Sequence, residues 1–195
     1  MSKPKDPQKR ENLVRVSLLV LSKYEYDDIN IEELRKKADV GNSTFYDTFK
    51  NKLDWYEQMR RLRCKQCWQD LLNHYSVMQD TEFSEKMKHL SIYLLLYTRR
   101  NKEFRKITKG HMLWRSRFAD LIRSDADEQE RFNRELNAYA VKMKMDPEEV
   151  RMNVCLLLSS AVRYGYDASE QSISIPFVTV KKNLTGISDQ LFPEG

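Results

Sequence analysis

The chain has 195 residues, of which 41% are hydrophobic and 32% are charged, a composition typical of a folded, soluble protein rather than of a disordered one. It contains only five glycines and five prolines, which argues against a many-stranded β protein and favours long helices with short connections. The net charge is +5. Most of this positive excess lies in residues 1–65, which hold 15 Lys and Arg against 11 Asp and Glu. An excess of basic residues in this part of the chain would favour contact with phosphate.

Apolar positions at helical spacing predict an all-α chain that begins with a disordered polar arm over residues 1–8. Two start signals stand out. Asn30 is an N-cap with Glu33 at the third helical position, and Asp146 is an N-cap followed by Pro147 in the first turn. The predicted helices cover residues 9–26, 31–38, 42–49, 53–75, 85–100, 102–109, 111–123, 125–145, 147–166 and 176–192.

The two short helices over residues 31–38 and 42–49, joined by three residues, form a helix-turn-helix pattern. Its side chains expected to face inward are Leu34, Ala38, Val40, Phe45 and Phe49. This leaves Asn42, Ser43, Tyr46 and Asp47 on the outer side of the second helix, where they could meet the edges of a DNA major groove. An ordinary helical hairpin is the alternative.

This segment resembles the TetR family of bacterial helix-turn-helix transcriptional regulators. Ala38-x-Val40, Thr44-aromatic-Tyr46 and Phe49-x-x-Lys52 fall in the register of that family. The resemblance implies an all-α, TetR-like fold, with a three-helix DNA-binding domain over residues 9–52 and a helical ligand-binding and dimerisation domain over residues 53–195. It also implies a protein of the cytoplasm, associated with the nucleoid.

The resemblance also implies roles for individual residues. Base contacts would come from Asn42, Ser43 and Asp47, where Asn can pair with adenine and Asp can accept from cytosine. Phosphate contacts would come from Thr44, Tyr46, Lys50 and Lys52, the last at the N-terminus of a long helix. The chain departs from the family pattern at Asp39, where the turn usually has glycine, and at Gly41, where a small polar cap is usual. The recognition helix itself contains no Lys or Arg.

The C-terminal part of the chain carries two predicted sets of residues. The first could line a pocket for a small hydrophobic effector or form plain core: Trp68, Phe104, Met112, Trp114 and Phe118. The second could form a four-helix dimer interface with a second copy or pack within one chain: Val154, Leu158, Val162, Val178, Leu184, Ile187 and Leu191.

A weaker resemblance concerns residues 94–101, followed by residues 107–111. They are similar to the bacterial nucleoid occlusion factor, a TetR-type protein that binds DNA and antagonises the division protein FtsZ. It implies a partner-binding surface at Arg99, Arg100 and Asn101. In this chain Leu96 and Thr98 stand where glycines are expected.

Other chemistry finds little support in the sequence. Cys64-x-x-Cys67 has no second ligand pair nearby, and His74, His89 and His111 are scattered, so we expect no metal site. There is no phosphate-binding loop or nucleophile motif. We therefore expect no catalytic residues, no enzymatic activity and no cofactor.

Compartment and function follow from the remaining features. No apolar run reaches the roughly 18–20 residues of a membrane span, no signal peptide is evident, and an odd number of cysteines, three, fits a reducing cytoplasm. The expected function is a sequence-specific transcriptional regulator, most often a repressor in this family, acting as a homodimer on a pseudo-palindromic site in double-stranded DNA and released by an effector. The alternative is a DNA-binding division inhibitor acting through FtsZ.

Overall fold

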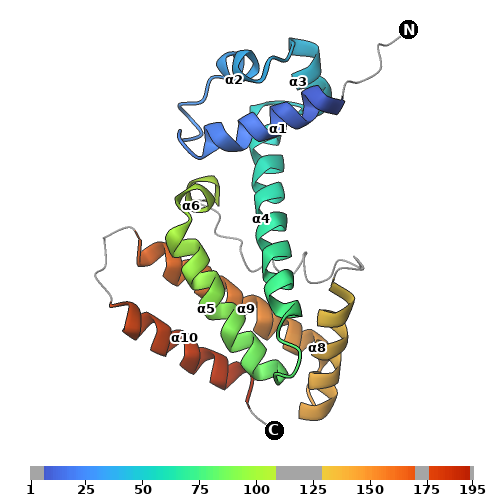
Figure 1. Cartoon of the computed structure of the whole chain (residues 1–195), viewed down its shortest axis with the longest axis vertical. Helices are drawn as coiled ribbons and strands as arrows, with labels where there is room; N and C mark the ends of the chain where they lie inside the picture. Colours follow the sequence, from blue (N-terminus) through green and yellow to red (C-terminus); the bar gives the residue numbers. More distant parts are fainter. Residues whose placement is uncertain (1–6, 109–128, 170–175, 194–195) are drawn as a thin grey trace. The chain divides into compact units, whose positions relative to one another are not determined.

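The computed structural model describes residues 7–108, 129–169 and 176–193, and in these ranges all regular secondary structure is helical, as expected (Figure 1). The chain forms two compact units. The first spans Met1–Cys64 and Lys102–Lys109, and the second spans Lys65–Asn101 and Gly110–Gly195. Within the described ranges, no helix is both long enough and apolar enough to cross a lipid bilayer.

The first unit packs its helices around one hydrophobic core. The helices are α1 (Pro7–Leu21), α2 (Ile31–Ala38), α3 (Asn42–Thr48), the start of α4 (Lys52–Ser76) and α6 (Lys102–Thr108). Figure 1 shows α2 and α3 on the same side of α1, which both of them contact. The buried members of this core are Leu13, Val16, Val20, Leu21, Ile29, Leu34, Ala38, Val40, Phe45, Phe49, Trp55, Met59 and Ile107.

Local signals fix both ends of α2. The Asn30 side chain accepts a 2.8 Å hydrogen bond from the backbone N–H of Glu32, which satisfies one of the donors left free at the helix start. Asp39 ends the helix in the left-handed conformation, with φ 52° and ψ 47°, and its N–H bonds to Lys36 O. The side-chain amide of Asn12 in α1 donates a 2.7 Å hydrogen bond to Ala38 O and so ties this end of α2 to α1. The predicted bounds of α2 are confirmed.

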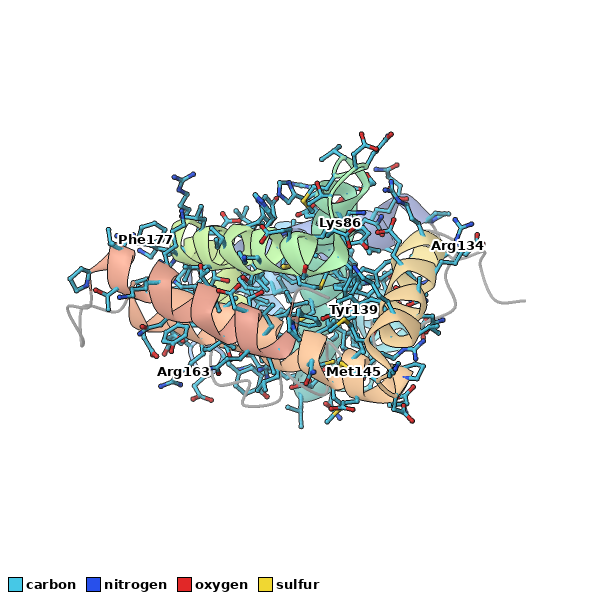
Figure 2. The ribbon with its side chains drawn as sticks, turned by 90° about the horizontal axis from the view of Figure 1, so that it is seen from below. Lys86, Arg134, Tyr139, Met145, Arg163 and Phe177 are labelled. Atoms are coloured by element: carbon cyan, nitrogen blue, oxygen red, sulfur yellow. The ribbon has the colours of Figure 1, made fainter. Side chains whose placement is uncertain are left out.

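The second unit is a helical bundle made of the rest of α4, α5 (Phe83–Arg100), α8 (Glu130–Met143), α9 (Pro147–Asp167) and α10 (Phe177–Leu191). The helices α5 and α9 contact each other most extensively, and α10 packs against both. Figure 2 shows Tyr139 on the inner side of α8 and Arg134 on its outer side. The Tyr139 hydroxyl donates a 3.0 Å hydrogen bond to Pro193 O, which holds Pro193 against α8.

One glycine allows the close approach of α5 and α9. A Cβ atom added at Gly165 would lie 2.6 Å from Thr98 Cβ, closer than two carbon atoms can pack. Gly165 therefore sets how tightly these two helices pack.

At the other end of α9, the Asp146 side chain accepts a 2.7 Å hydrogen bond from Glu148 N–H, which confirms the predicted start signal.

A buried charge joins three helices of the second unit. Lys86 of α5 is 2% exposed, and its Nζ donates a 2.5 Å hydrogen bond to Glu135 Oε2 of α8. The Tyr75 hydroxyl at the end of α4 donates to the same oxygen at 2.6 Å, and Arg131 Nε donates to Glu135 Oε1 at 2.8 Å. Burial alone would raise the pKa of Glu135, but the hydrogen bonds from Lys86, Tyr75 and Arg131 outweigh it and lower that pKa.

Three predicted helix ends need correction. The helix expected over residues 9–26 spans Pro7–Leu21, so residues 7 and 8 are helical and do not belong to the expected arm. The helix expected to begin at residue 85 begins at Phe83. The predicted dimer stripe is largely internal, since Val154, Leu158 and Val162 are 0% exposed within the single chain.

The remaining members of that stripe differ in exposure. Leu184 of α10 is also 0% exposed, so these four residues are covered by their own chain and are unavailable to a second copy. Ile187 and Leu191 are partly buried, and Val178 is 76% exposed. The apolar residues that do reach the surface of α9 are Met152 and Leu156.

Candidate nucleic-acid interface

The short helix α3 is held from behind by two phenylalanines one helical turn apart. Phe45 is 0% exposed and Phe49 is 1% exposed, and their ring centroids lie 5.3 Å apart. Phe49 N–H donates to Phe45 O at 2.8 Å as the helix ends. This burial fixes which side of α3 faces solvent, so the predicted core positions of the helix-turn-helix are confirmed.

The outward side of α3 carries the polar residues that the sequence placed there. Asn42, Ser43, Tyr46 and Asp47 are exposed, and Thr44 is half-buried. The Tyr46 ring is 53% exposed and meets Phe45 edge-on, with centroids 5.2 Å apart. This contact with buried Phe45 holds the phenol ring in place, while the other side of the ring remains in solvent.

The turn from α3 into α4 is built from side-chain caps. Asn51 Oδ1 accepts from Asp54 N–H at 2.9 Å, and Asp54 Oδ2 accepts from the backbone N–H of Lys50 at 2.8 Å. The hydrogen bond from the Lys50 N–H, followed by one from Gln58, lowers the pKa of Asp54. These contacts fix the backbone that carries Lys50, whose side chain is exposed.

Lys52, expected to contact phosphate, lies against the loop that follows α1. Its ammonium nitrogen is 4.6 Å from the centroid of the Tyr26 ring and 3.4 Å from the carbonyl oxygen of Asp27. Tyr26 in turn packs on Tyr56 of α4, with centroids 4.7 Å apart. The lysine is thus held beside the start of α4, and its role toward phosphate stays a prediction.

One residue of this surface was missed by sequence reasoning. Arg35 of α2 donates a hydrogen bond from Nη1 to Oδ1 of Asn42, the first residue of α3. With Lys36 and Lys37, it makes the last turn of α2 basic. Helical spacing places Arg35 beside the apolar stripe of α2, where it is half-buried, but says nothing about a contact across the turn, so only the geometry reveals it.

The predicted effector pocket is only partly described. Trp68 is 4% exposed, donates from Nε1 to Gln129 Oε1 at 3.0 Å, and meets Phe132 edge-on. Phe104 is 0% exposed in α6. Met112, Trp114 and Phe118 lie outside the described residues. Trp68 and Phe104 are both buried, and a pocket stays a prediction.

The predicted partner-binding residues lie at the end of α5. Arg99 and Arg100 are exposed, and Asn101 caps the helix, with its N–H donating to Tyr97 O at 2.9 Å. The Arg99 guanidinium lies 5.2 Å from the centroid of the Phe177 ring at the start of α10, a cation–π contact within the unit. Figure 2 shows Phe177 at this end of the bundle.

Comparison with solved structures identifies the fold. A crystal structure from Syntrophomonas wolfei, of a protein assigned to the TetR-family transcriptional regulators, matches with a TM-score of 0.66 at 14% identity over 96% of each chain. One from Mesorhizobium loti, assigned to the same family, matches at 0.59 and 14% over 97% of each. A transcriptional regulator of Streptomyces coelicolor matches at 0.52 and 12% over 96% of this chain and 99% of that one.

These matches extend over nearly the whole chain, and the fold is therefore that of TetR-family regulators. No protein-family model and no curated protein matches the sequence of this chain.

Proposed function

We propose that the chain is a DNA-binding transcription regulator that inserts α3 into the major groove. The observation that carries this proposal is that α3 has two different sides: Phe45 and Phe49 are buried behind it, and the exposed side chains in front are polar. A helix presented in this way by a helix-turn-helix fits the width of the major groove. The fold that the chain shares with TetR-family regulators supports the same function.

Contacts divide by chemistry on this surface. Asn42, Ser43 and Asp47 carry groups that can exchange hydrogen bonds with base edges, and these are the residues we assign to sequence recognition. Tyr46, Thr44 and Lys50 lie beside them and would bind backbone phosphates, with Lys52 adding charge at the start of α4. Phosphate contacts set affinity and its salt dependence, whereas base contacts set sequence preference.

The active form would be a homodimer on a pseudo-palindromic site. Two copies of α3 would then enter successive major grooves roughly 34–36 Å apart. Met152 and Leu156 on α9 and Val178 on α10 are exposed apolar residues that a second copy could cover, since a two-fold interface presents the same patch from both subunits. This surface replaces most of the stripe expected from the sequence.

Control of transcription would be repression relieved by an effector. Binding at the site would block transcription, and a small molecule in the second unit would release the DNA if it binds the released form more tightly than the DNA-bound form. Binding of FtsZ at Arg99, Arg100 and Asn101 has no observation in its favour and forms no part of the proposal.

A random-site selection with the full chain tests the function. The protein is incubated with random duplexes, bound DNA is recovered and sequenced over several rounds, and the chain with Phe45 replaced by Asp serves as a control with a disrupted recognition helix. We expect enrichment of an inverted repeat whose half-sites are about 10 base pairs apart. Recovery of random sequence by the intact chain at every salt concentration tested would contradict sequence-specific binding.

A further inference from the structure

Arg35 and Asn42 come from two different helices and meet on the surface that we assign to DNA. Arg35 lies in the last turn of α2, Asn42 opens α3, and the guanidinium Nη1 donates a hydrogen bond to the amide Oδ1. A guanidinium has only donors. The contact therefore fixes the orientation of the amide, with its oxygen toward Arg35 and its nitrogen, Nδ2, directed elsewhere.

The atoms that this pair retains for a ligand are mostly donors. Arg35 Nε is buried and has no hydrogen-bond partner among the described residues, so Nη2 and the second hydrogen of Nη1 are the donors that the guanidinium can offer to a ligand. Asn42 is exposed and contributes the two hydrogens of Nδ2. Together the two side chains form a donor surface with a positive charge.

Base edges in the major groove distinguish sharply between such surfaces. Guanine presents two acceptors, N7 and O6, whereas adenine presents one acceptor, N7, and one donor, N6. A free asparagine pairs with adenine because its oxygen accepts from N6 while its nitrogen donates to N7. With one lone pair of the Asn42 oxygen engaged by Arg35 and a guanidinium beside it, the pair offers more donors than acceptors, which matches the two acceptors of guanine better than the mixed edge of adenine.

We infer that Arg35 and Asn42 act together as a guanine-reading pair, with Arg35 as an additional specificity-determining residue of the interface. The inference rests on the proposed function and deepens it. It also replaces the expectation that Asn42 reads adenine. α3 contains no Lys or Arg, so Arg35 supplies the missing positive charge from the neighbouring helix, at the first residue of the recognition helix.

Base preference at single positions tests the inference. Affinities are measured by fluorescence anisotropy for the selected site and for each single base-pair replacement within it, with the full chain and with Arg35→Ala, Arg35→Met and Lys36→Ala. Arg35→Met keeps the apolar stem of the side chain, and Lys36→Ala is the matched control, since Lys36 pairs with Glu32 at 2.9 Å on the exposed side of the same helix. Circular dichroism melts verify that each variant is folded.

We expect the unmodified chain to prefer guanine over adenine at one position of each half-site by about 10-fold or more. In Arg35→Ala and Arg35→Met the guanine preference should be lost and should shift toward adenine, because the amide oxygen of Asn42 is released. Lys36→Ala should keep the guanine preference.

Two results overturn the inference and leave the proposed function intact. One is an Arg35 variant that weakens binding to every sequence alike and flattens the salt dependence without changing base preference, since Arg35 would then bind phosphate. The other is a selected site with no position at which the Arg35 variants change the preferred base. Failure of the unmodified chain to select any sequence refutes the proposed function itself.

Discussion

The indole Nε1 of Trp55 donates a 2.8 Å hydrogen bond to the hydroxyl oxygen of Ser17, and both side chains are completely buried. Ser17 in turn donates to Leu13 O at 2.6 Å, within α1. The bond joins α1 to the first turn of α4 inside the core that supports α3. It satisfies the only polar atom of a large side chain in an apolar environment, where an unpaired N–H is costly.

Replacing Ser17 with Ala should therefore lower the free energy of unfolding by about 1–3 kcal/mol, because the indole N–H stays buried without a partner. Urea denaturation followed by circular dichroism measures the change. Ser22→Ala is the matched control, since the Ser22 hydroxyl donates to the backbone oxygen of Leu19 near the end of α1. Equal stabilities for Ser17→Ala and the unmodified chain would show that this bond contributes nothing.

The left-handed backbone at Asp39 gives a second prediction. Its φ of 52° is costly for residues other than Gly, Asn and Asp. We expect Asp39→Val to destabilise the first unit by about 1–2 kcal/mol, whereas Asp39→Gly should be as stable as the unmodified chain or more so. Lys144, with φ 56° after α8, provides a parallel case, and Lys144→Gly should likewise not destabilise. Thermal melts of the four proteins compare them, and an Asp39→Val variant of unchanged stability is the contrary result.

The ion pair between buried Lys86 and partly exposed Glu135 predicts a pH dependence of stability. Because the pKa of Glu135 is lower in the folded chain than its ordinary value of 4.5, the unfolded chain takes up a proton on this group at higher pH. Its contribution to stability is thus fully present above about pH 4.5 and is lost as the pH falls through the lower, folded pKa.

Glu135→Gln should remove this dependence and should destabilise the chain near pH 7 by about 3 kcal/mol, because Lys86 remains buried without its counter-charge. Urea denaturation near pH 7 and near pH 4 measures both effects. Glu82→Gln is the control, since Glu82 forms an exposed ion pair with Lys142 that should contribute at most about 1 kcal/mol. If the two variants behave alike at both pH values, the hydrogen bonds around Glu135 contribute no more to stability than an exposed ion pair.

Local signals made parts of the fold and site predictable. The N-cap at Asn30 fixed the start of α2, the N-cap at Asp146 fixed that of α9, and helical spacing identified Phe45 and Phe49 as the buried side of α3. In each case the determining interaction lies within a few residues of sequence, so a single segment contains the information.

Long-range contacts account for what the sequence did not reveal. The stripe of Val154, Leu158 and Val162 was correctly seen as apolar, but spacing does not say which surface covers it, and within the chain it is already covered. In α4 the apolar Leu53 is 58% exposed, while Trp55 two residues later is completely buried and donates its N–H to Ser17 of α1. The contact of Arg35 with Asn42 likewise crosses between two helices.

The most direct test of the proposed function compares two exposed tyrosines of the first unit. Tyr46 on α3 is 53% exposed, and Tyr24 beyond the end of α1 is 48% exposed, so they match in residue type and accessibility and differ in location. The measurement is the affinity of Tyr46→Ala, Tyr24→Ala and the unmodified chain for the selected DNA site across a range of salt concentrations.

We predict that Tyr46→Ala weakens binding to all sequences by at least about 5-fold, the equivalent of 1 kcal/mol, whereas Tyr24→Ala binds like the unmodified chain. Equal affinities of Tyr46→Ala and the unmodified chain at every salt concentration would contradict the docking of α3 on DNA.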